Sequence, residues 1–584
     1  MNPQDIIKKY SEVKTKKDRY LPVWRDIAKY TGILVDPDDA KNEGDDLDSY
    51  TLDPTTALAV IQSADYLKGI IIGTGQKGFD ILPSDEVLEL VDRSAVTDWF
   101  KYATANIIKE MNHPDAGFHD AFQAYFYDQV SFGNSGVGTF KNHLKSTSSA
   151  NALIFREYGV DTMAIDVGKN GVVDTSYNLY EWRTNQFVNE FCYRGGEFDK
   201  EMFERLPREV KDAYLSNDLN KTFKVVQGIL PNSEYDPAAL GIAGAKYKGY
   251  WFLESSKDSI FFEEAFKERP ISYGRPVKVR NEIYGRAYGT VLLSSIRALN
   301  EIVNGLMITL DKQREPAMGV FGNAIAGDGV IDTSSGSITT FDASKLNGNT
   351  PIFPIQDVGD PSGIVNFLLP YLNDKISTAF KVDILLDFNA DANMTATESL
   401  QRYTIRNKSI LGLIIQQIND VYIPTIRRVI SILMDMGRLG VEADDEMAEH
   451  YIEIGAADRI IPDAVAQCIR EGKPWYKIQF NNEIEKISNT DKIENLLKML
   501  QGLQGLLAFN PQLSSAIDWH RLLWDLSAAL GFDYAVISER EFRKQMEAQA
   551  AAQAEQLALQ QRTEESVINK NNASAIRNAE SGLR

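Results

Sequence analysis

The stretch LLSSIRALNEIVNGLMITL, residues Leu292 to Leu310, predicts the helix around which the rest of the chain is organised. Its apolar residues step alternately by four and by three, and this spacing keeps one face of a helix buried. Pro316 ends the helix, because proline lacks a backbone N–H and restricts the residue before it. The apolar face carries Leu292, Ile296, Leu299, Val303, Leu306 and Leu310.

A second helix is predicted from DPSGIVNFLLPYLNDKISTAFKVDILL, residues 360–386. Asp360 is suited to the N-cap and Pro361 to the first helical position. Pro370 lies inside the helix, so a kink is expected there. One face carries Ile364, Leu368, Leu372, Ile376 and Phe380.

Between the two helices the pattern is that of short strands and turns. Turn residues at 327–329 (GDG) and 334–336 (SSG) punctuate β-type runs at 330–333 and 337–341, which indicates a small hairpin module. At about 1.5 Å per residue, each helix reaches roughly 35–40 Å and can hold that module away from the main mass. Spacing alone leaves a second interpretation open, in which both helices lie inside an ordinary mixed domain and the hairpin is a surface insertion.

Composition sets the outer limits of the interpretation. The chain has 584 residues, 43% of them apolar and 25% charged, which is typical of a globular protein with a large core. Its net charge of −20 argues against a surface that grips nucleic acid, but not against a protein that lets nucleic acid pass. Cys192 and Cys468 are too far apart to suggest a disulfide scaffold, which fits a reducing compartment. No signal peptide and no run of about 18 apolar residues is visible, so no membrane is expected as a partner.

Hydrophobic periodicity and turn residues predict the other elements. The opening segment, 6–30, reads as mostly helical, and its basic residues favour a solvated face over a nucleic-acid patch. An acidic loop at 36–48 follows. The Ala/Gln-rich tail after residue 540 suits a helix that orders only against copies of itself or a partner, or else stays disordered. Helices are expected at 55–67, 85–112, 117–132, 207–216 and 511–530, strands at 155–160, 162–166, 171–175 and 224–230, a hairpin turn at 169–171, and a strand followed by a helix at 478–502.

No motif in the chain predicts an enzyme or a cofactor. Residues 73–78 (GTGQKG) match the dinucleotide pattern, but a helical pattern precedes them and a strand-like run at 79–83 follows, the reverse of what that motif needs. There is no P-loop sequence, and the five histidines lack the spacing of metal ligands.

The acidic segment 387–398 has two interpretations. It resembles a calcium loop, but Ala392 stands where that loop needs glycine for a sharp turn. The favoured interpretation is a capping box formed by Thr395 and Glu398. The box would open a helix that continues to Val429, with a kink at Pro424.

Several short motifs, in this order along the chain, resemble the portal (head-to-tail connector) proteins of short-tailed bacteriophages. The most specific is Met394-Thr395-Ala396-Thr397-Glu398 with Arg402, which follows two helices and a β-rich excursion. The resemblance runs from about residue 6 to about 545, and it departs at Gly78-Phe79, where a Trp-Phe pair is expected, and in the tail after Arg540. The other matching stretches are Trp24, Phe132-Gly133-Asn134, Gly171 to Asp174, Glu181 to Thr184, Tyr284-Gly285-Arg286 and Ser295 to Asn300.

This resemblance implies an α+β fold that is mainly helical, a portal fold with wing, stem, clip and crown regions assembled as a ring. The implied boundaries are an N-terminal wing at 1–284, stem helix 1 at 285–315, the clip at 316–360, stem helix 2 at 361–386, a channel loop, long helix and wing return at 387–487, the crown at 488–545, and the Ala/Gln-rich tail at 546–584.

The resemblance also implies a function and a set of partners. Such a protein is a homo-oligomer, usually of twelve subunits, made in the host cytoplasm and placed at the portal vertex of the virion. Double-stranded DNA passes through its channel during packaging and ejection. The terminase large subunit docks first, tail adaptor proteins replace it, and major capsid and scaffolding proteins surround the ring. The rival classes are a non-channel virion scaffold or adaptor and, less favoured, an enzyme that acts on nucleic acid or carbohydrate.

The candidate site residues fall into three groups. Lys375 and Lys381 lie six residues apart, which corresponds to about 600° of rotation along a helix. Their side chains would therefore point about 120° apart around the helix axis, so only one of the two lysines would point into the channel. The alternative is that both pair with acids of the adjacent subunit. Channel-facing candidates are Lys375, Lys381, Asp387, Asn389, Asp391 and Asn393; family-motif positions are Thr395, Glu398, Arg402, Tyr284, Gly285 and Arg286; subunit-interface candidates are Leu292, Ile296, Leu299 and Val303.

Overall fold

The computed structural model of this chain divides into two compact units, which are described separately. Unit 1 comprises Met1–Ile71 and Lys109–Met436, and unit 2 comprises Ile72–Ile108 and Gly437–Arg584. Among the residues that the structure describes, the fold is mixed α+β and about half helical, which agrees with the predicted α+β class. The structure describes residues 2–31, 53–73, 78–142, 151–194, 197–236, 241, 243–256, 259–320, 340–346, 350, 352–355, 359, 361–382, 412–442, 446–454 and 456–480.

A five-stranded antiparallel sheet forms one part of unit 1, with strand order β10-β9-β8-β5-β4. The predicted hairpin turn connects β4 to β5, and Gly171 adopts φ +69° there, a conformation that favours glycine. Buried side chains of β4, β5, β8 and β9 pack against helix α1 (Pro3–Asp18). The strands are β4 (Met163–Val167), β5 (Val173–Arg183), β8 (Thr222–Pro231), β9 (Tyr247–Leu253) and β10 (Phe262–Phe266).

A second sheet of unit 1 has three antiparallel strands in the order β11-β2-β3. Helices α6 (Phe118–Ser131) and α15 (Ile423–Asp435) pack against it. The predicted helix at 117–132 is confirmed as α6, which ends two residues before Gly133, where φ is +75°. The strands are β2 (Ser135–Lys141), β3 (Leu153–Tyr158) and β11 (Ile271–Gly274).

Smaller elements complete unit 1. Helix α7 packs on α8 and α9, and their apolar side chains form a core with β8 and β9. The predicted helix at 207–216 is thereby confirmed as α9. The elements are α2 (Leu21–Thr31), α3 (Thr55–Ile72), η2 (Pro114–Ala116), α7 (Thr184–Cys192), β6 (Tyr193–Arg194), β7 (Glu197–Phe198), α8 (Lys200–Arg205) and α9 (Arg208–Leu215).

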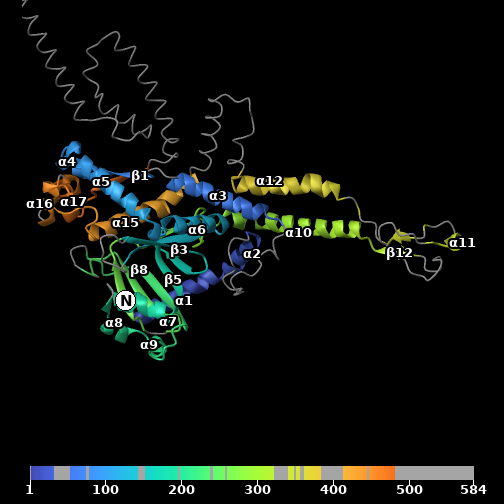
Figure 1. The fold of residues 1–584 in the computed structure, drawn as a ribbon, viewed down its shortest axis with the longest axis horizontal. Helices are drawn as coiled ribbons and strands as arrows, with labels where there is room; N and C mark the ends of the chain where they lie inside the picture. Colours follow the sequence, from blue (N-terminus) through green and yellow to red (C-terminus); the bar gives the residue numbers. More distant parts are fainter. Residues whose placement is uncertain are drawn as a thin grey trace, which may run out of the picture. The chain divides into compact units, whose positions relative to one another are not determined.

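Helices α10 (Tyr288–Arg314) and α12 (Leu369–Ala379) run side by side in opposite directions (Figure 1). The rings of Tyr288 and Phe380 meet at one end, and Gln313 Nε2 donates to the Gly359 carbonyl oxygen at the other, 3.5 Å away. Strands β12 (Met318–Val320) and β13 (Ile352–Pro354) pair beyond them, followed in Figure 1 by α11 (Ala343–Leu346). We call α10, β12, β13, the helical turn η4 (Ile364–Leu368) and α12 the arm.

Two prolines are accommodated in the same way. Each follows a π-helical turn, η4 (Ile364–Leu368) before Pro370 and η6 (Ile418–Tyr422) before Pro424. The residue before each proline donates its N–H to the carbonyl five positions back instead of four. A wider turn relieves the clash between the proline ring and the preceding turn. The two predicted kinks therefore coincide with π turns.

Helix α10 is long and apolar enough to count as a candidate membrane span, although the sequence pattern predicted none. By length and composition alone it could cross a membrane, since one 18-residue window has a mean hydropathy of 1.3. Core helices of soluble proteins pass the same test. In the part of the chain that the structure describes, no other helix does.

Unit 2 is held together by contacts between its two chain segments. Strands β1 (Phe79–Pro83) and β14 (Tyr476–Phe480) pair antiparallel, and Trp99 Nε1 donates to the Leu439 carbonyl oxygen over 3.0 Å. The predicted helix at 85–112 is broken at residues 91 and 92 into α4 and α5. The helices are α4 (Asp85–Leu90), α5 (Arg93–Met111, which continues into unit 1), α16 (Glu446–Glu453), η7 (Ala457–Arg459) and α17 (Asp463–Arg470).

Several predictions concern residues outside the described ranges. They are the β runs at 330–333 and most of 337–341, the channel-loop candidates Asp387, Asn389, Asp391 and Asn393, the motif residues Thr395, Glu398 and Arg402, and the predicted helices beyond residue 480.

Candidate functional site

The candidate site is the place where the arm begins, which we call the root: the turn at 132–134, the segment 284–289 and the side chains around them. The Asn134 side chain closes the root with two reciprocal hydrogen bonds. Its Nδ2 donates to the Gly285 carbonyl oxygen over 2.8 Å, and its Oδ1 accepts from the Gly285 N–H over 2.7 Å. Asn134 is fully buried, so these bonds satisfy backbone groups that water cannot reach.

Glycine is required on both sides of this contact. A Cβ on Gly133 would lie 2.5 Å from the Arg286 carbonyl carbon, and its φ of +75° disfavours other residues as well. A Cβ on Gly289, in the first turn of α10, would lie 2.4 Å from the Ser131 carbonyl oxygen. The end of α6 and the start of α10 therefore touch backbone to backbone.

Three aromatic side chains pack beside this contact. Tyr20 stacks on Trp24 with ring centroids 5.7 Å apart, and Tyr284 lies 5.0 Å from the first ring and 5.2 Å from the second. The Tyr284 hydroxyl accepts a hydrogen bond from the Ile165 N–H over 3.2 Å. Burial raises the pKa of Tyr284, so the phenol stays neutral. The cluster connects α2, the root and β4.

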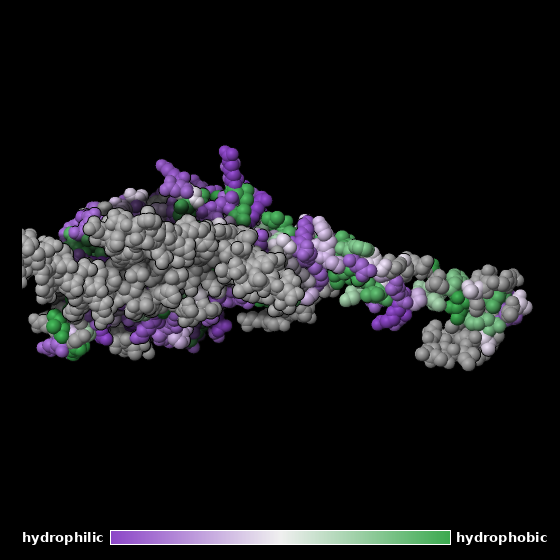
Figure 2. Space-filling model, turned by 90° about the horizontal axis from the view of Figure 1, so that it is seen from above, coloured by the Kyte–Doolittle hydropathy of each residue, from purple (hydrophilic) through white to green (hydrophobic). Residues whose placement is uncertain are grey.

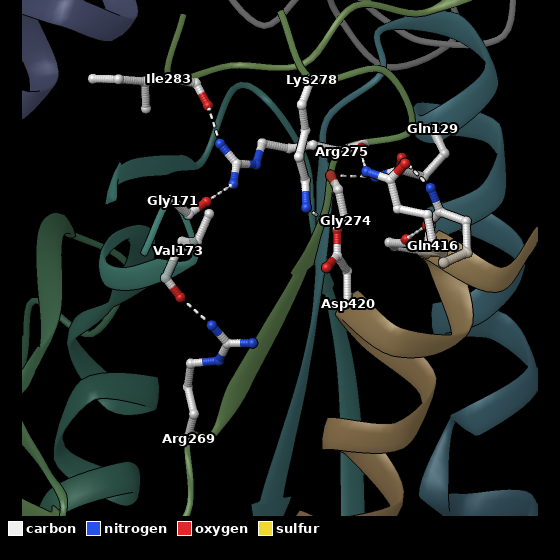
Figure 3. A network of polar contacts seen from close by, with 12 residues as sticks. Gln129, Gly171, Val173, Arg269, Gly274, Arg275, Lys278, Ile283, Gln416 and Asp420 are labelled. Carbon is white, nitrogen blue, oxygen red and sulfur yellow. Dashed lines mark hydrogen bonds and ion pairs between the residues drawn. The ribbon is translucent and has the colours of Figure 1, made fainter. Parts of the chain in front are cut away.

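Two arginines connect the root to the β4–β5 turn (Figure 3). The Arg275 guanidinium donates to the carbonyl oxygens of Ile283, over 2.8 Å, and of Gly171. Arg269 donates to the Val173 carbonyl oxygen. Burial lowers the pKa of both arginines, and each guanidinium donates hydrogen bonds to backbone carbonyl oxygens. These bonds fasten the strand before the arm to the five-stranded sheet.

Polar side chains also fasten β11 to the neighbouring helices (Figure 3). Gln129 Nε2, on α6, donates to the Gly274 carbonyl oxygen over 2.9 Å. Gln416 Nε2 donates to the Arg275 carbonyl oxygen over 2.7 Å, and Lys278 Nζ lies 2.8 Å from Asp420 Oδ2. Two of these side chains bind backbone carbonyl groups and one forms an ion pair, and together they hold β11 and the residues after it against the neighbouring helices.

The root unites two motifs that the sequence analysis had placed far apart, Phe132-Gly133-Asn134 and Tyr284-Gly285-Arg286. Comparison with known protein families identifies the family of this chain. A family model described as bacteriophage head to tail connecting protein matches residues 3–537. This chain belongs to that family.

Two solved structures resemble the connecting protein at low similarity. The first is titled "Neck of empty GTA particle computed with C6 symmetry"; identity is 13%, the TM-score 0.30, and 76% of this chain and 94% of that chain are covered. The second is titled "Virion of native gene transfer agent (GTA) particle", with 13% identity, a TM-score of 0.25, and coverage of 71% and 99%. No curated protein matches the chain.

Family membership confirms the central prediction at a coarse level. The connecting protein is a structural component of the phage particle between head and tail, not an enzyme. Among the described residues no group of three or more His, Cys, Asp or Glu side chains could hold a metal ion. The restriction to short-tailed phages stays a prediction.

The structure corrects the choice of subunit-interface residues on α10. Leu292, Ile296 and Leu299 are 7%, 1% and 0% exposed within a single chain, and Val303 is half-buried. Helix α10 packs on α2, α6 and α12, so the regular apolar face covers the connecting protein's own core. A side chain already buried in its own chain has little surface left for a neighbour.

Other apolar side chains of the arm are exposed instead. Phe367 is 78% exposed, Tyr371 60%, Met307 54%, Leu310 52% and Ile308 49%. Figure 2 shows hydrophobic residues in green along the arm and at its far end. The sequence carried the signal in the doubled apolar pairs Met307-Ile308 and Phe367-Leu368, which one helix face cannot bury.

The two candidate channel lysines differ in setting. Lys375 is exposed on α12, whereas Lys381 is half-buried and lies beyond the end of that helix with φ +64°. The predicted angle of about 120° between them is therefore wrong, because it assumed continuous helix through both residues. Neither ammonium lies within 4 Å of a carboxylate in the described part of the chain.

Proposed function

We propose that the connecting protein assembles into a ring around a channel at one vertex of the capsid, through which double-stranded DNA enters during packaging and leaves during ejection. The observation that carries the proposal is the outer half of the arm, where five large apolar side chains are each at least 49% exposed. Contiguous exposed apolar surface of this kind marks an interaction site. Identical arms side by side, related by rotation, would cover it and close a ring.

A lipid bilayer is a weaker candidate for covering the arm. Arg297 and Glu301 lie near the middle of α10, and Arg297 pairs with Asp26 on α2. Charged side chains in the middle of a membrane span are costly. In a contact between α10 and a helix of a neighbouring subunit, by contrast, Arg297 and Glu301 would lie at the edge of the contact, where water reaches them.

The charge of the chain supports passage rather than capture of DNA. A net charge of −20 repels phosphate, so a channel with acidic walls does not hold moving DNA. Within such walls, Lys375 or Lys381 with Asp387, Asn389, Asp391 and Asn393 would form sparse rings of charge. Contacts of this kind are weak and screened by salt.

The remaining assignments follow the family resemblance. The arm supplies the two stem helices, and the β12–β13 end of the arm forms the clip, on which the terminase large subunit docks before tail adaptors replace it. The two sheets belong to the wing, towards the capsid and scaffolding proteins. Twelve subunits is the expected number, and Thr395, Glu398 and Arg402 would begin the helix that leads back to the wing.

The test is the mass and shape of the purified protein. Light scattering should give many times 65.4 kDa, and negative-stain microscopy should show rings with a central hole. The double variant Ile308→Asp/Phe367→Asp should fold but fail to form rings, because charges then replace the apolar contact. Leu215→Asp, at a 74% exposed site on α9, is the matched control and should form rings normally.

One alternative outcome would overturn the ring, and another would overturn the assignment of the arm as the ring interface. A stable monomer or dimer of the wild-type protein at micromolar concentration would favour a non-channel scaffold or adaptor. Rings that survive the double substitution on the arm would show that the arm is not the interface.

A further inference from the structure

Unit 1 contains an open cavity of about 830 Å³ between its two sheets and α15. The walls come from β2 and β3 on one side, β5, β8, β9 and β10 on the other, and α7 and α15 at the ends. This volume lies in the range of small-ligand sites, about 300–1,000 Å³. The cavity belongs to a single chain and does not depend on the ring proposed above.

The side chain of Arg428, on α15, lines this cavity, and the residue is only 8% exposed. Its Nε donates to the Thr139 carbonyl oxygen over 3.5 Å, and the guanidinium lies 5.2 Å from the centre of the Phe266 ring. In the described part of the chain no carboxylate oxygen lies within 4 Å of it. Burial lowers the pKa of Arg428 to about 10, so the side chain stays charged at neutral pH.

A buried guanidinium that lacks an ion pair is unusual, because its charge has been taken out of water and is compensated only at longer range, here by Asp435, Glu264 and Glu268. Its planar fork of N–H donors matches the two oxygens of a carboxylate or phosphate. Two more basic side chains, Lys141 and Arg156, line the same cavity, and neither has a carboxylate within 4 Å among the described residues.

The acidic side chains of the cavity are engaged or lie at its edge. Glu264 Oε1 accepts hydrogen bonds from Gln227 Nε2 over 2.8 Å and from Trp251 Nε1 over 2.6 Å. Asp435 pairs with Lys267 over 2.7 Å. Glu190 is exposed. Glu264 and Asp435 therefore have closer partners than the cationic side chains of Arg428, Lys141 and Arg156.

Most of the remaining wall is aromatic. Tyr180 stacks on Trp251 with centroids 5.4 Å apart, and Phe191 meets the same indole edge-on at 5.2 Å. Phe266 lies on the side of Arg428. Apolar walls with a few convergent polar groups are typical of sites for small organic ligands.

We propose that this cavity binds a small organic anion, a carboxylate or phosphate carried on an apolar or aromatic body. The Arg428 guanidinium receives the oxyanion, Lys141 and Arg156 add positive charge, and the aromatic side chains of β5, β9 and α7 contact the body.

The full-length protein can be tested with two fluorescent probes. The first is 1-anilinonaphthalene-8-sulfonate, an oxyanion on an aromatic body, and the second is N-phenyl-1-naphthylamine, the same body without the anion. The wild-type protein should contain one saturable site per chain that prefers the sulfonate. Arg428→Gln should weaken that site at least about tenfold, as expected for loss of charge-assisted hydrogen bonds. Millimolar inorganic phosphate should compete with the sulfonate probe.

The matched control is Arg208→Gln, which removes the same charge from a side chain that is 91% exposed on α9. It leaves the exposed arm unchanged, so dye bound there is common to both variants and cancels in the comparison. Equal binding by Arg428→Gln and Arg208→Gln, or no preference for the sulfonate, would overturn the proposal. If Arg428→Gln does not fold, Arg428→Lys keeps the charge and loses the fork; unchanged sulfonate affinity in that variant would equally overturn it.

Discussion

The root of the arm and its outer half are parts of the same pair of helices, yet they differ in where their contacts come from. At the root, Asn134 and Gly285 satisfy each other inside one chain, and glycine backbones touch. In the outer half, Ile308 and Phe367 are 49% and 78% exposed. The contacts of the root therefore lie within one chain, whereas the described residues leave apolar surface exposed in the outer half, which marks a site of interaction.

The largest effect should come from closing the space at the root. Gly133→Ala forces a Cβ to within 2.5 Å of the Arg286 backbone at a φ of +75°, so we expect a loss of about 4 kcal/mol or more in unfolding free energy. Gly171→Ala is the matched control, since its φ is +69° but no atom lies within 4 Å of the added Cβ. It should cost only about 1 kcal/mol. Denaturant unfolding measures both, and equal losses would mean that the backbone contact contributes nothing.

A smaller loss is expected from Asn134→Ala. The substitution leaves the N–H and the carbonyl of Gly285 buried without partners, which should cost about 2–3 kcal/mol. Asn151→Ala serves for comparison, because Asn151 is also a buried asparagine with local hydrogen bonds but lies away from the root. Hydrogen exchange at the Gly285 amide should speed up only in Asn134→Ala. Unchanged exchange there would show that the root is held by other contacts.

Next to the root, the buried carboxyl of Asp128 and the half-buried carboxyl of Glu157 predict a dependence of stability on pH. Asp128 on α6 is hydrogen-bonded to Glu157 on β3, and burial raises the pKa of Asp128 and brings the pKa of Glu157 to about 7. The folded state therefore binds more protons than the unfolded state between about pH 4.5 and 7. This contribution to stability is fully present below the lower value and is lost as the pH rises through 7.

Unfolding midpoints measured from pH 5 to pH 8 should test this directly. The wild-type midpoint should fall over that range because of the carboxyl pair, and Asp128→Asn should flatten the fall, since an amide donates to Glu157 without ionising. Asp85→Asn, at an exposed carboxyl of unit 2, should leave the slope unchanged. An identical slope in wild type and Asp128→Asn would exclude the pair as its source.

The smallest effect is expected in the outer half of the arm. Gly305 lies in α10 with open space around the position of a Cβ, so Gly305→Ala should stabilise the subunit by about 0.5–1 kcal/mol. Gly305→Ala would then raise the unfolding free energy and Gly133→Ala would lower it. This pair of variants would show the difference between the outer half of the arm and the root. A loss of ring formation in Gly305→Ala, without a loss of stability, would place that position against a neighbouring subunit.

Local pattern alone was enough to locate many of the elements. The four-and-three spacing from Leu292 to Leu310 falls inside α10, and the aromatic helix ended before Gly133 as predicted. Helix periodicity and the special backbone of glycine and proline act over a few residues, so they can be read without knowing the fold. The short motifs also indicated the family, because their order along the chain is itself a sequence property.

Contacts between distant residues could not be obtained in this way. Which partner covers Leu292, Ile296 and Leu299 depends on the position of α2, α6 and α12, and periodicity describes only that a face is apolar. Asn134 meets Gly285 across 151 positions, and Arg428 lies beside Thr139 across 289. Nothing in either local sequence marks the other, because hydrogen bonding and packing depend on distance in space, and only the tertiary structure sets that distance.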